Sequence, residues 1–507
     1  MIINRVKTNP LKVADSARSD RSSVGMHRLF QYTCILILLS LFIDTTHAKS
    51  SEDKNQADKS QRPNILLITV DDLNDWLGYT GSHPNTRTPN IDALANRGTA
   101  FTQTFSQYPL CGPSRASLFT GLLPSTLGIY HHPLSDEKVE QVAKQHNTVL
   151  LHTAFRQNGY KTMAVGKLMH KHVVKDSVDL SGGRGDWDKQ PDGSRLSFAS
   201  DFTHTDWGIY PAPEEKMSDP KAAAWAVERL QEKHDKPFML MVGLLRPHAP
   251  WYVPQPYFDA IGDAKNVMLP PYQANDLDDI STYAQQTNIL PYMPKTPWLQ
   301  ENQFWHDMIQ GYLASINFAD HYVGQVLKAL ENSPYADNTI VLLTSDHGYH
   351  LGEKGTTQKH TLWERANKVP LIIAGPSLPK GEQRDQTVGL IDIYPTLLDL
   401  AQLPKNPINE GHSLLPVIKD NEIKWPYPTF TQYVRKLSNN EKRTGQAIQF
   451  QQWRYILYGD GSEELYNHKE DPNEWTNLAG NPETRTKYAS LIEKLKVQLP
   501  KSFKFSK

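Results

Sequence analysis

The chain of 507 residues contains only two cysteines, Cys34 and Cys111. Cys34 lies in an apolar stretch near the N-terminus that is typical of a removable leader, so a processed chain would keep Cys111 alone. A single thiol cannot form an internal disulfide, which excludes a small domain held together by disulfides. Cys111 is therefore a small core residue, an incidental thiol or a reactive group.

The chain also lacks an excess of charge of either sign. It has 54 Lys and Arg residues and 55 Asp and Glu residues, with a formal net charge of −1 and a pI near 7.0. This balance gives no general attraction to nucleic acid, which is not expected as a partner. Any affinity for an anion must come from a few cations placed at one site. At this length the chain can bury a large core and form more than one domain.

Apolar runs long enough to cross a membrane are absent as well. Residues 26–48 have the pattern of a secretory signal, with a positive start, 11 mostly apolar residues at 33–43 and an acceptable cleavage site at 46–48. Spanning a bilayer takes about 20 apolar residues, so we expect a cleaved leader over residues 1–48, with an uncleaved anchor as the alternative. Translation would start at Met1 or Met26. The protein is expected to be exported, periplasmic or secreted, with no stable membrane insertion once the leader is removed.

After a polar linker at residues 49–62, near-continuous apolar runs alternate with helical patterns. Continuous apolar character indicates strands that are buried on both faces, as in parallel sheets. The pattern predicts an α/β sandwich with a mainly parallel central sheet over residues 63–420. The expected strands are 64–70, 162–165, 238–242, 340–344 and 369–374, and the expected helices are 88–98, 149–158, 221–233, 307–332 and 391–401.

The pattern changes after about residue 420. A strand is expected at 449–458, followed by a turn, and a helix at about 487–498. Residues 421–507 are therefore predicted to form a small antiparallel sheet with a terminal helix. Two stretches without clear periodicity, 174–218 and 270–297, are rich in Gly, Pro, Asp, Tyr or Trp. We interpret them as surface loops that shape substrate access.

Acidic residues follow two of the predicted strands directly. Asp71 and Asp72 come after the first strand, and Asp346 and His347 follow the strand at 340–344. In parallel sheets, ligands bind beyond the carboxyl ends of the strands, so both groups are expected at the same rim. Three carboxylates favour a hard divalent ion, with Ca²⁺ preferred over Mg²⁺. His347 is also a good zinc ligand, so ligand type alone leaves zinc open.

Cys111 opens the string Cys-Gly-Pro-Ser-Arg, and residues 114–122 have a helical pattern that starts near Pro113. A nucleophile at the positive end of a helix would lie beside a favourable position for an anion such as sulfate. An unmodified cysteine could act there as a thiolate, as in some phosphatases. That alternative usually needs several glycines before the arginine, and here only Gly112 is present.

The string from Cys111 to Gly121 resembles the C-x-P-S-R signature of type I sulfatases, in which the cysteine is oxidised to formylglycine. Further segments resemble the same family in the same order, and together they cover the chain from about residue 62 to 365. They are Gly166–His170, which contains Lys167 and His170; Arg246–Pro250, which contains His248; and Lys359. The chain resembles the iduronate-2-sulfatase branch most, but it departs from that enzyme at Trp251–Tyr252 and His131–His132.

This resemblance implies an alkaline-phosphatase-like fold and a specific set of roles. Cys111 would be converted to formylglycine (3-oxoalanine) by a formylglycine-generating maturation enzyme. The metal, expected to be calcium, would be held by residue 111 together with the four rim residues. Arg115, Lys167 and Lys359 would contact sulfate, His248 or Lys359 would protonate the leaving group, and His170 would accept a proton in the second step.

The resemblance implies one function, and two alternatives stay open beside it. The first is hydrolysis of sulfate esters on a sulfated polysaccharide, with algal polymers such as ulvan or carrageenan favoured and glycosaminoglycans with 2-sulfated uronate second. The second is a metal-dependent phosphohydrolase of the same superfamily, which would be expected to use Ser or Thr and more histidine ligands. The third is a sulfated-glycan-binding protein that has lost catalysis, although every expected catalytic residue is present.

Overall fold

The computed structural model describes residues 62–504, so the predicted leader and almost all of the linker lie outside the described residues. The described part contains a large central sheet that is mainly parallel, as the sequence predicts. Its strand order is β10 (Glu382–Arg384), β2 (Thr99–Phe105), β9 (Lys368–Ala374), β8 (Thr339–Ser345), β1 (Asn64–Val70), β6 (Phe238–Leu244), β3 (Lys161–Gly166) and β4 (Leu180–Ser181), with β11 (Val388–Gly389) also paired to β2.

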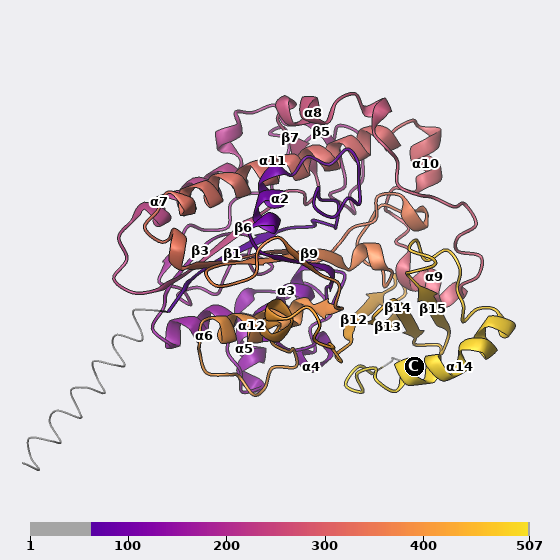
Figure 1. Cartoon of the computed structure of the whole chain (residues 1–507). Coiled ribbons are helices and arrows are strands. Elements are labelled where there is room, and N and C mark those ends of the chain that lie inside the picture. The colour runs from indigo at the N-terminus through magenta and orange to yellow at the C-terminus, as the bar shows by residue number, and fades with distance from the viewer. Residues whose placement is uncertain (1–61, 505–507) are drawn as a thin grey trace, which may run out of the picture. The chain divides into compact units, whose positions relative to one another are not determined.

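The central strand β1 shows why the apolar run is continuous. Leu66, Ile68 and Val70 belong to one hydrophobic core, whereas Ile65 and Leu67 belong to the other, so successive side chains enter opposite layers. Figure 1 shows the sheet between these two layers of helices. On one face lie α2 (Pro89–Asn96), α7 (Ser218–Gln231), α8 (Gln255–Ile261) and α11 (Trp305–Glu331); on the other lie α3 (Cys111–Thr120), α4 (Pro124–Leu127), α5 (Asp136–Gln145), α6 (Leu151–Gln157) and α12 (Ile393–Leu400).

All five strands predicted from apolar runs are present in this sheet, within about one or two residues at most ends. The exception to parallel pairing is β9, which runs antiparallel to both of its neighbours, β8 and β2. Strand β2 was not predicted because its sequence, TAFTQTF, has polar residues among the apolar ones and its centre is only partly buried. A search for continuous apolar runs misses a strand of this kind.

The C-terminal region forms a second, antiparallel sheet, which confirms the predicted architecture. It consists of β12 (Thr429–Lys436), β13 (Lys442–Phe450), β14 (Trp453–Tyr458) and β15 (Glu463–Asn467) in sequence order. Helix α14 (Pro482–Lys496) packs on it, with Ile492 and Leu495 against Ile448 and Leu465. The helix starts earlier than predicted because the Asn481 side chain accepts hydrogen bonds from the first backbone N–H groups. The domain boundary near residue 420 stays a prediction.

The two predicted loop regions differ in content. Residues 174–218 hold only short elements, β4, β5 (Trp207–Ile209) and a 3₁₀ turn at Glu214–Lys216, and β5 pairs with β7 (Trp251–Val253). Residues 270–297, by contrast, contain α9 (Thr282–Asn288) and the start of α10 (Thr296–Glu301), which the sequence analysis did not predict. Helix α9 is polar and short, so it lacks an apolar period; the Ser281 side chain caps it. The remaining short helix is α13 (Leu415–Lys419).

A buried ionic cluster joins the C-terminal sheet to the segment that precedes β9. His468 Nε2 lies 3.0 Å from Glu474 Oε1, and its Nδ1 contacts Glu364. Arg454 Nε lies 3.1 Å from the same Glu474 oxygen. Burial alone would lower the pKa of His468, but the two glutamates outweigh it and raise this pKa from 6.5 to about 9. His468 is therefore a cation in the folded protein at neutral pH.

We expect His468→Gln to lower the free energy of unfolding by roughly 3 kcal/mol near pH 6. The folded-state pKa lies above the unfolded value, so the stabilisation is complete below pH 6.5 and is lost as the pH rises through about 9. Denaturant unfolding at a series of pH values measures the difference, with His321→Gln on the exposed side of α11 as the control. A difference that stays constant with pH would contradict a role for the imidazolium charge.

Candidate active site

The two acidic groups meet at the carboxyl rim of the central sheet because β1 and β8 are parallel neighbours. Val70 pairs with Ser345, so Asp71 and Asp346 leave the sheet at the same level. The chain then turns sharply, with Asp72 at a φ of 60°, and the Asp72 N–H donates to Asp346 Oδ1 at 3.1 Å. All three carboxylates are buried. The structure thus brings together the acidic residues that the sequence placed at one rim.

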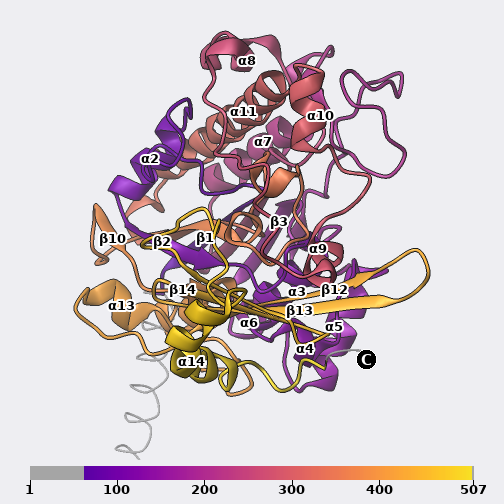
Figure 2. The same cartoon turned by 90° about the vertical axis from the view of Figure 1, so that its right-hand side faces the viewer.

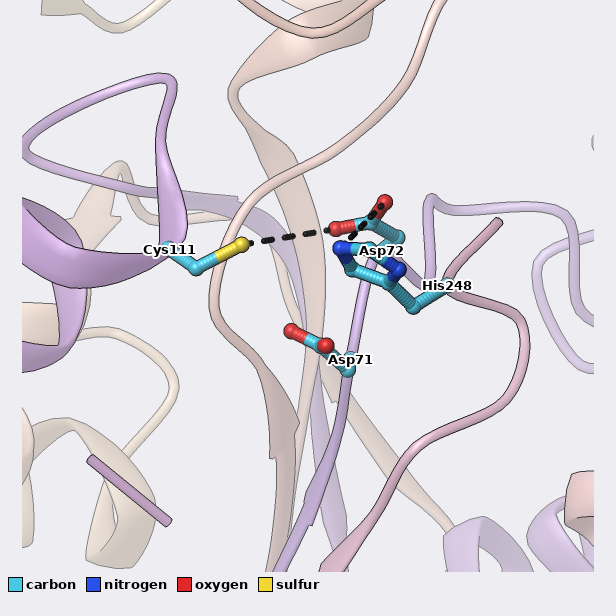
Figure 3. Close-up of side chains that lie close together, drawn as sticks. All are labelled: Asp71, Asp72, Cys111 and His248. Carbon is cyan, nitrogen blue, oxygen red and sulfur yellow. Dashed lines mark hydrogen bonds and ion pairs between the residues drawn. The ribbon is translucent and has the colours of Figure 1, made fainter. Parts of the chain in front are cut away.

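Cys111 faces Asp71 and Asp72 from the first turn of α3 (Figure 3). Its Sγ lies 3.2 Å from His347 Nε2, 3.2 Å from Lys359 Nζ and 3.8 Å from Asp72 Oδ1. The helix begins at Cys111, ahead of the predicted start near Pro113. The Ser114 N–H already donates to the Leu110 carbonyl, and Pro113 is tolerated because the first turn needs no N–H from it. The earlier start places residue 111 itself at the positive helix end.

Three cations offset the three buried carboxylates. Lys167 Nζ contacts Asp71, and Lys359 Nζ lies 2.8 and 3.0 Å from the two oxygens of Asp72. Arg115 bridges Asp71 and Asp346: its Nη2 lies 2.9 Å from Asp71 Oδ1, and its Nε lies 2.8 Å from Asp346 Oδ2. Without such pairing, burial of three ionised carboxylates would be strongly unfavourable.

Arg115 lies in a different place from the one that the expected sulfate contact requires. Its Nη1 donates to the backbone carbonyls of Lys167 and Leu168 at 2.9 and 2.6 Å, while its other two nitrogens bind the carboxylates. All three guanidinium nitrogens are thus engaged, and the side chain is buried. In this geometry Arg115 holds Asp71 and Asp346 in position rather than facing the cavity.

The cations change the pKa values of the carboxylates unequally. Burial raises the pKa of Asp71, but Lys167 and Arg115 outweigh it and hold that pKa well below its usual range. For Asp72, burial dominates over the attraction of Lys359 and His347, and the pKa is raised. Burial also raises the pKa of the Cys111 thiol, although Lys167 and Lys359 act in the opposite direction.

His347 and His248 present the same ring nitrogen to the carboxylates. His347 Nδ1 donates to the Gly348 carbonyl at 3.0 Å, and His248 Nδ1 donates to the Ala249 carbonyl at 2.6 Å. Their Nε2 atoms lie 3.3 and 3.9 Å from Asp72 oxygens. A backbone acceptor on Nδ1 fixes the tautomer that leaves an Nε2 lone pair for a ligand or a proton.

His170 lies at the side of the same cavity and stacks on His132, with ring centroids 3.8 Å apart. Burial, reinforced by Lys167, lowers the pKa of His170 to about 4, and burial with His170 as neighbour lowers that of His132 to about 2. Both rings are therefore neutral at pH 7. In the sequence, His132 stands out only as a departure from the iduronate-2-sulfatase pattern.

The cluster opens into a cavity of about 330 Å³. Its lining includes Cys111, Lys167, His170, His248 and Lys359, so the predicted catalytic residues other than Arg115 share one pocket. The sequence did not identify the aromatic residues of the wall. These come from the two predicted loops and from the segment after β8, and include Trp187, Phe202, His204, Tyr292 and Tyr349.

The donor atoms fit a hard divalent ion. Ligand atoms of Asp71, Asp72, Cys111 and His248 lie within 4.8 Å of one another, as do those of Asp72, Cys111, Asp346 and His347. The set is rich in carboxylate oxygen, and oxidation of Cys111 would replace sulfur with oxygen, which suits Ca²⁺ or Mg²⁺. The five predicted ligands, residue 111 among them, would hold such an ion at the helix end.

Comparison with known proteins places these residues in context. A family model described as Sulfatase matches residues 63–403, and one described as N-sulphoglucosamine sulphohydrolase, C-terminal, matches residues 352–502. A Sulfatase of Formosa agariphila is 42% identical over 467 residues, covering 89% of each chain. The human Iduronate 2-sulfatase is 29% identical, covering 74% of this chain and 76% of its own.

Two further comparisons concern activity and fold. An Ulvan-active sulfatase of Formosa agariphila is 27% identical over 463 residues, covering 88% of this chain and 82% of its own. The crystal structure of the Phosphonate Monoester Hydrolase of Agrobacterium radiobacter superposes with a TM-score of 0.69 at 22% identity, covering 86% of this chain and 96% of that one. At this level of sequence identity, the superposition is evidence for the fold only.

We expect Ca²⁺ to raise the melting temperature of chelator-treated protein, because binding at about 100 times the dissociation constant adds about 2.7 kcal/mol to folding stability. Asp346→Asn should remove most of this metal-induced shift. Asp75→Asn is the matched control, because Asp75 is nearby but pairs with Arg365 at 2.5 Å and not with the cluster. Thermal scans with Ca²⁺, Mg²⁺ and Zn²⁺ make the comparison; an equal shift in Asp346→Asn and wild type would exclude this ligand set.

Proposed function

Because the chain belongs to the sulfatase family, whose members hydrolyse sulfate esters, we propose that its substrate is a sulfated polysaccharide or an oligosaccharide derived from one. We further propose that residue 111 carries the reaction after oxidation of Cys111 to formylglycine. The observation that carries this proposal is the placement of Cys111 Sγ within 4 Å of Asp72, His347 and Lys359 at a buried helix end. A modified residue there would lie beside carboxylates, an imidazole and a cation at once.

Two added groups would supply the chemistry that this chain's side chains lack. Formylglycine at position 111, once hydrated, offers a hydroxyl that can attack sulfur. A divalent ion held by Asp71, Asp72, Asp346 and His347 would bind a sulfate oxygen and lower the pKa of that hydroxyl.

The remaining steps belong to residues of the cavity wall. Lys359 and Lys167 would bind the sulfate oxygens, where negative charge accumulates in the transition state. His248 Nε2 points toward Asp72 and would protonate the departing sugar alcohol, with Lys359 as the alternative acid. Burial and the charges of Lys359 and Lys167 lower the pKa of His248, and a bound sulfate anion would counter those charges. In the second half of the reaction, His170 would accept the proton of the other hydroxyl of residue 111, so that the aldehyde re-forms and sulfate is expelled.

Algal polymers such as ulvan or carrageenan are the first candidates for the substrate. The predicted export signal suits an enzyme that acts on a polymer outside the cytoplasm, and the similarity to an Ulvan-active sulfatase supports this choice. Glycosaminoglycans with 2-sulfated uronate are the second candidate, supported by the similarity to Iduronate 2-sulfatase. Within residues 62–504, no helix combines the length and apolar character needed to cross a bilayer.

The phosphohydrolase alternative has less support from the cluster. A cysteine occupies the nucleophile position, where that class is expected to carry Ser or Thr. Only two histidines, His347 and His248, belong to the metal-compatible groups found among the described residues. This donor set favours one hard ion over a pair of zinc ions.

The first test is the mass of the peptide that contains residue 111, from protein co-produced with a formylglycine-generating enzyme. Conversion to the aldehyde should lower the mass by about 18 Da, or restore it on hydration. The same preparation should hydrolyse 4-nitrophenyl sulfate, and a chelator should abolish this activity. Cys111→Ser should fold normally and lose turnover. Unmodified cysteine in protein that remains active would contradict the formylglycine proposal.

His248→Ala tests the assignment of the leaving-group acid. We expect the loss in kcat/KM to be about 10²- to 10⁴-fold on an alkyl sulfate, whose alcohol is a poor leaving group. The loss on an aryl sulfate should be much smaller, because a phenolate leaves without a proton. Parallel assays on both esters give the two losses, and equal losses would assign His248 another role.

A further inference from the structure

The pocket at Cys111 continues into a larger groove. This outer groove has a volume of about 880 Å³, against about 330 Å³ for the inner pocket. Five residues line both cavities, and they form the passage between them: Leu110, Phe202, Leu290, Tyr292 and His360. The combined space exceeds what one sulfated monosaccharide needs and lies in the range of sites for larger ligands.

Aromatic side chains stand at the passage with unusual exposure. Phe202 is 78% exposed and Tyr292 is 38% exposed, and their ring centroids lie 5.9 Å apart. Phe202 comes from the long loop at 174–218, and Tyr292 comes from the segment between α9 and α10. Exposed rings that flank a pocket mouth offer apolar faces for stacking, although each would be better buried in the absence of a ligand.

The far wall of the groove carries positive charge. It is formed by the end of β12 and the turn that follows, which project from the body in Figure 2 and include Arg435 and Lys436. Arg435 Nη1 donates to the Ile289 carbonyl at 2.7 Å, which ties this hairpin to the α9–α10 segment. Lys436 is exposed and forms no ion pair with any carboxylate in the described part of the chain.

No acidic side chain lines the outer groove within the described residues, whereas two cationic side chains, Arg435 and Lys436, do. The whole chain has a formal net charge of −1, so this local excess of cations is not a general property of the surface. An exposed groove with cations and without carboxylates selects an anionic ligand.

We propose that the outer groove binds the sugar next to the sulfated one, and that this neighbour carries its own sulfate or carboxylate. The sugar ring lies against Tyr292 and Phe202 at the passage, and its anionic group contacts Lys436. The substrate is then an anionic oligosaccharide or polymer end of at least two residues rather than a small sulfate ester. This inference rests on the proposed function and specifies its substrate class.

The experiment measures kcat/KM for sulfate release from 4-nitrophenyl sulfate and from di-, tetra- and hexasaccharide fractions of ulvan, ι-carrageenan and chondroitin sulfate. The quantity of interest is the ratio of the oligosaccharide value to the aryl sulfate value. Lys436→Gln and Tyr292→Ala should each lower this ratio about five- to tenfold on the preferred oligosaccharide. Tyr292→Phe keeps the ring, and Lys405→Gln changes an exposed lysine that lines neither cavity, so both should retain the wild-type ratio.

Varying the ionic strength distinguishes the loss of a charge contact from a merely structural effect. The Lys436→Gln deficit should shrink as ionic strength rises, because an exposed charge contact is screened, whereas the Tyr292→Ala deficit should not. Titration of the same oligosaccharides into inactive Cys111→Ala by calorimetry should show the same order of affinities. If the wild type hydrolyses the aryl sulfate but both variants keep the wild-type ratio, the groove assignment is wrong and the proposed function stands. The same conclusion holds if no oligosaccharide gives a higher kcat/KM than the aryl sulfate. Failure of the matured wild type to hydrolyse any sulfate ester would overturn the proposed function and this inference with it.

Discussion

The structure around the site depends on one electrostatic constraint: three carboxylates are buried together where the central strands end. Asp71, Asp72 and Asp346 could not be ionised there alone, because the desolvation cost of each charge is several kcal/mol. Arg115, Lys167 and Lys359 offset this cost and leave the cluster near neutrality. A divalent ion would add two positive charges, and a sulfate group would bring compensating negative charge. The arrangement therefore favours binding of metal and anion together over binding of either one alone.

The division of labour among the three cations follows from their hydrogen bonds. Arg115 is fully engaged by two carboxylates and two backbone carbonyls, which a planar guanidinium with five N–H donors can satisfy at once. The two lysines end in compact ammonium groups that line the cavity and can exchange partners when an anion enters. Arg115 therefore orients the acidic residues, and Lys167 and Lys359 are the cations suited to bind the substrate.

The sequence predicted the scaffold and the acidic rim because both depend on simple regularities. Continuous apolar runs identify strands buried between two layers, and the residues that follow Val70 and Ser345 must emerge together if those strands are parallel neighbours. The sequence does not predict β2 and α9, because their polar residues interrupt the apolar periodicity of a strand or helix. It also does not predict the direction of the Arg115 side chain. The exposed aromatic residues Phe202 and Tyr292 were also beyond prediction, because a loop's composition does not say which ring will stand at a pocket mouth.

The C-terminal sheet contributes to the site without a residue in the cluster. Arg454 Nη1 donates to the Leu362 carbonyl at 2.9 Å, and Trp363 Nε1 donates to Glu464 Oε2 at 2.8 Å. These bonds hold the segment that carries Lys359, three residues earlier, against β14 and β15. The C-terminal family model begins at residue 352, ahead of this segment and far ahead of the sheet itself. Since β12 also supplies the charged wall of the outer groove, the same sheet fixes a cation at residue 111 and shapes the surface where a neighbouring sugar would lie. If the outer groove binds the neighbouring sugar as proposed, changes in this sheet would alter substrate choice while the carboxylate cluster stays intact.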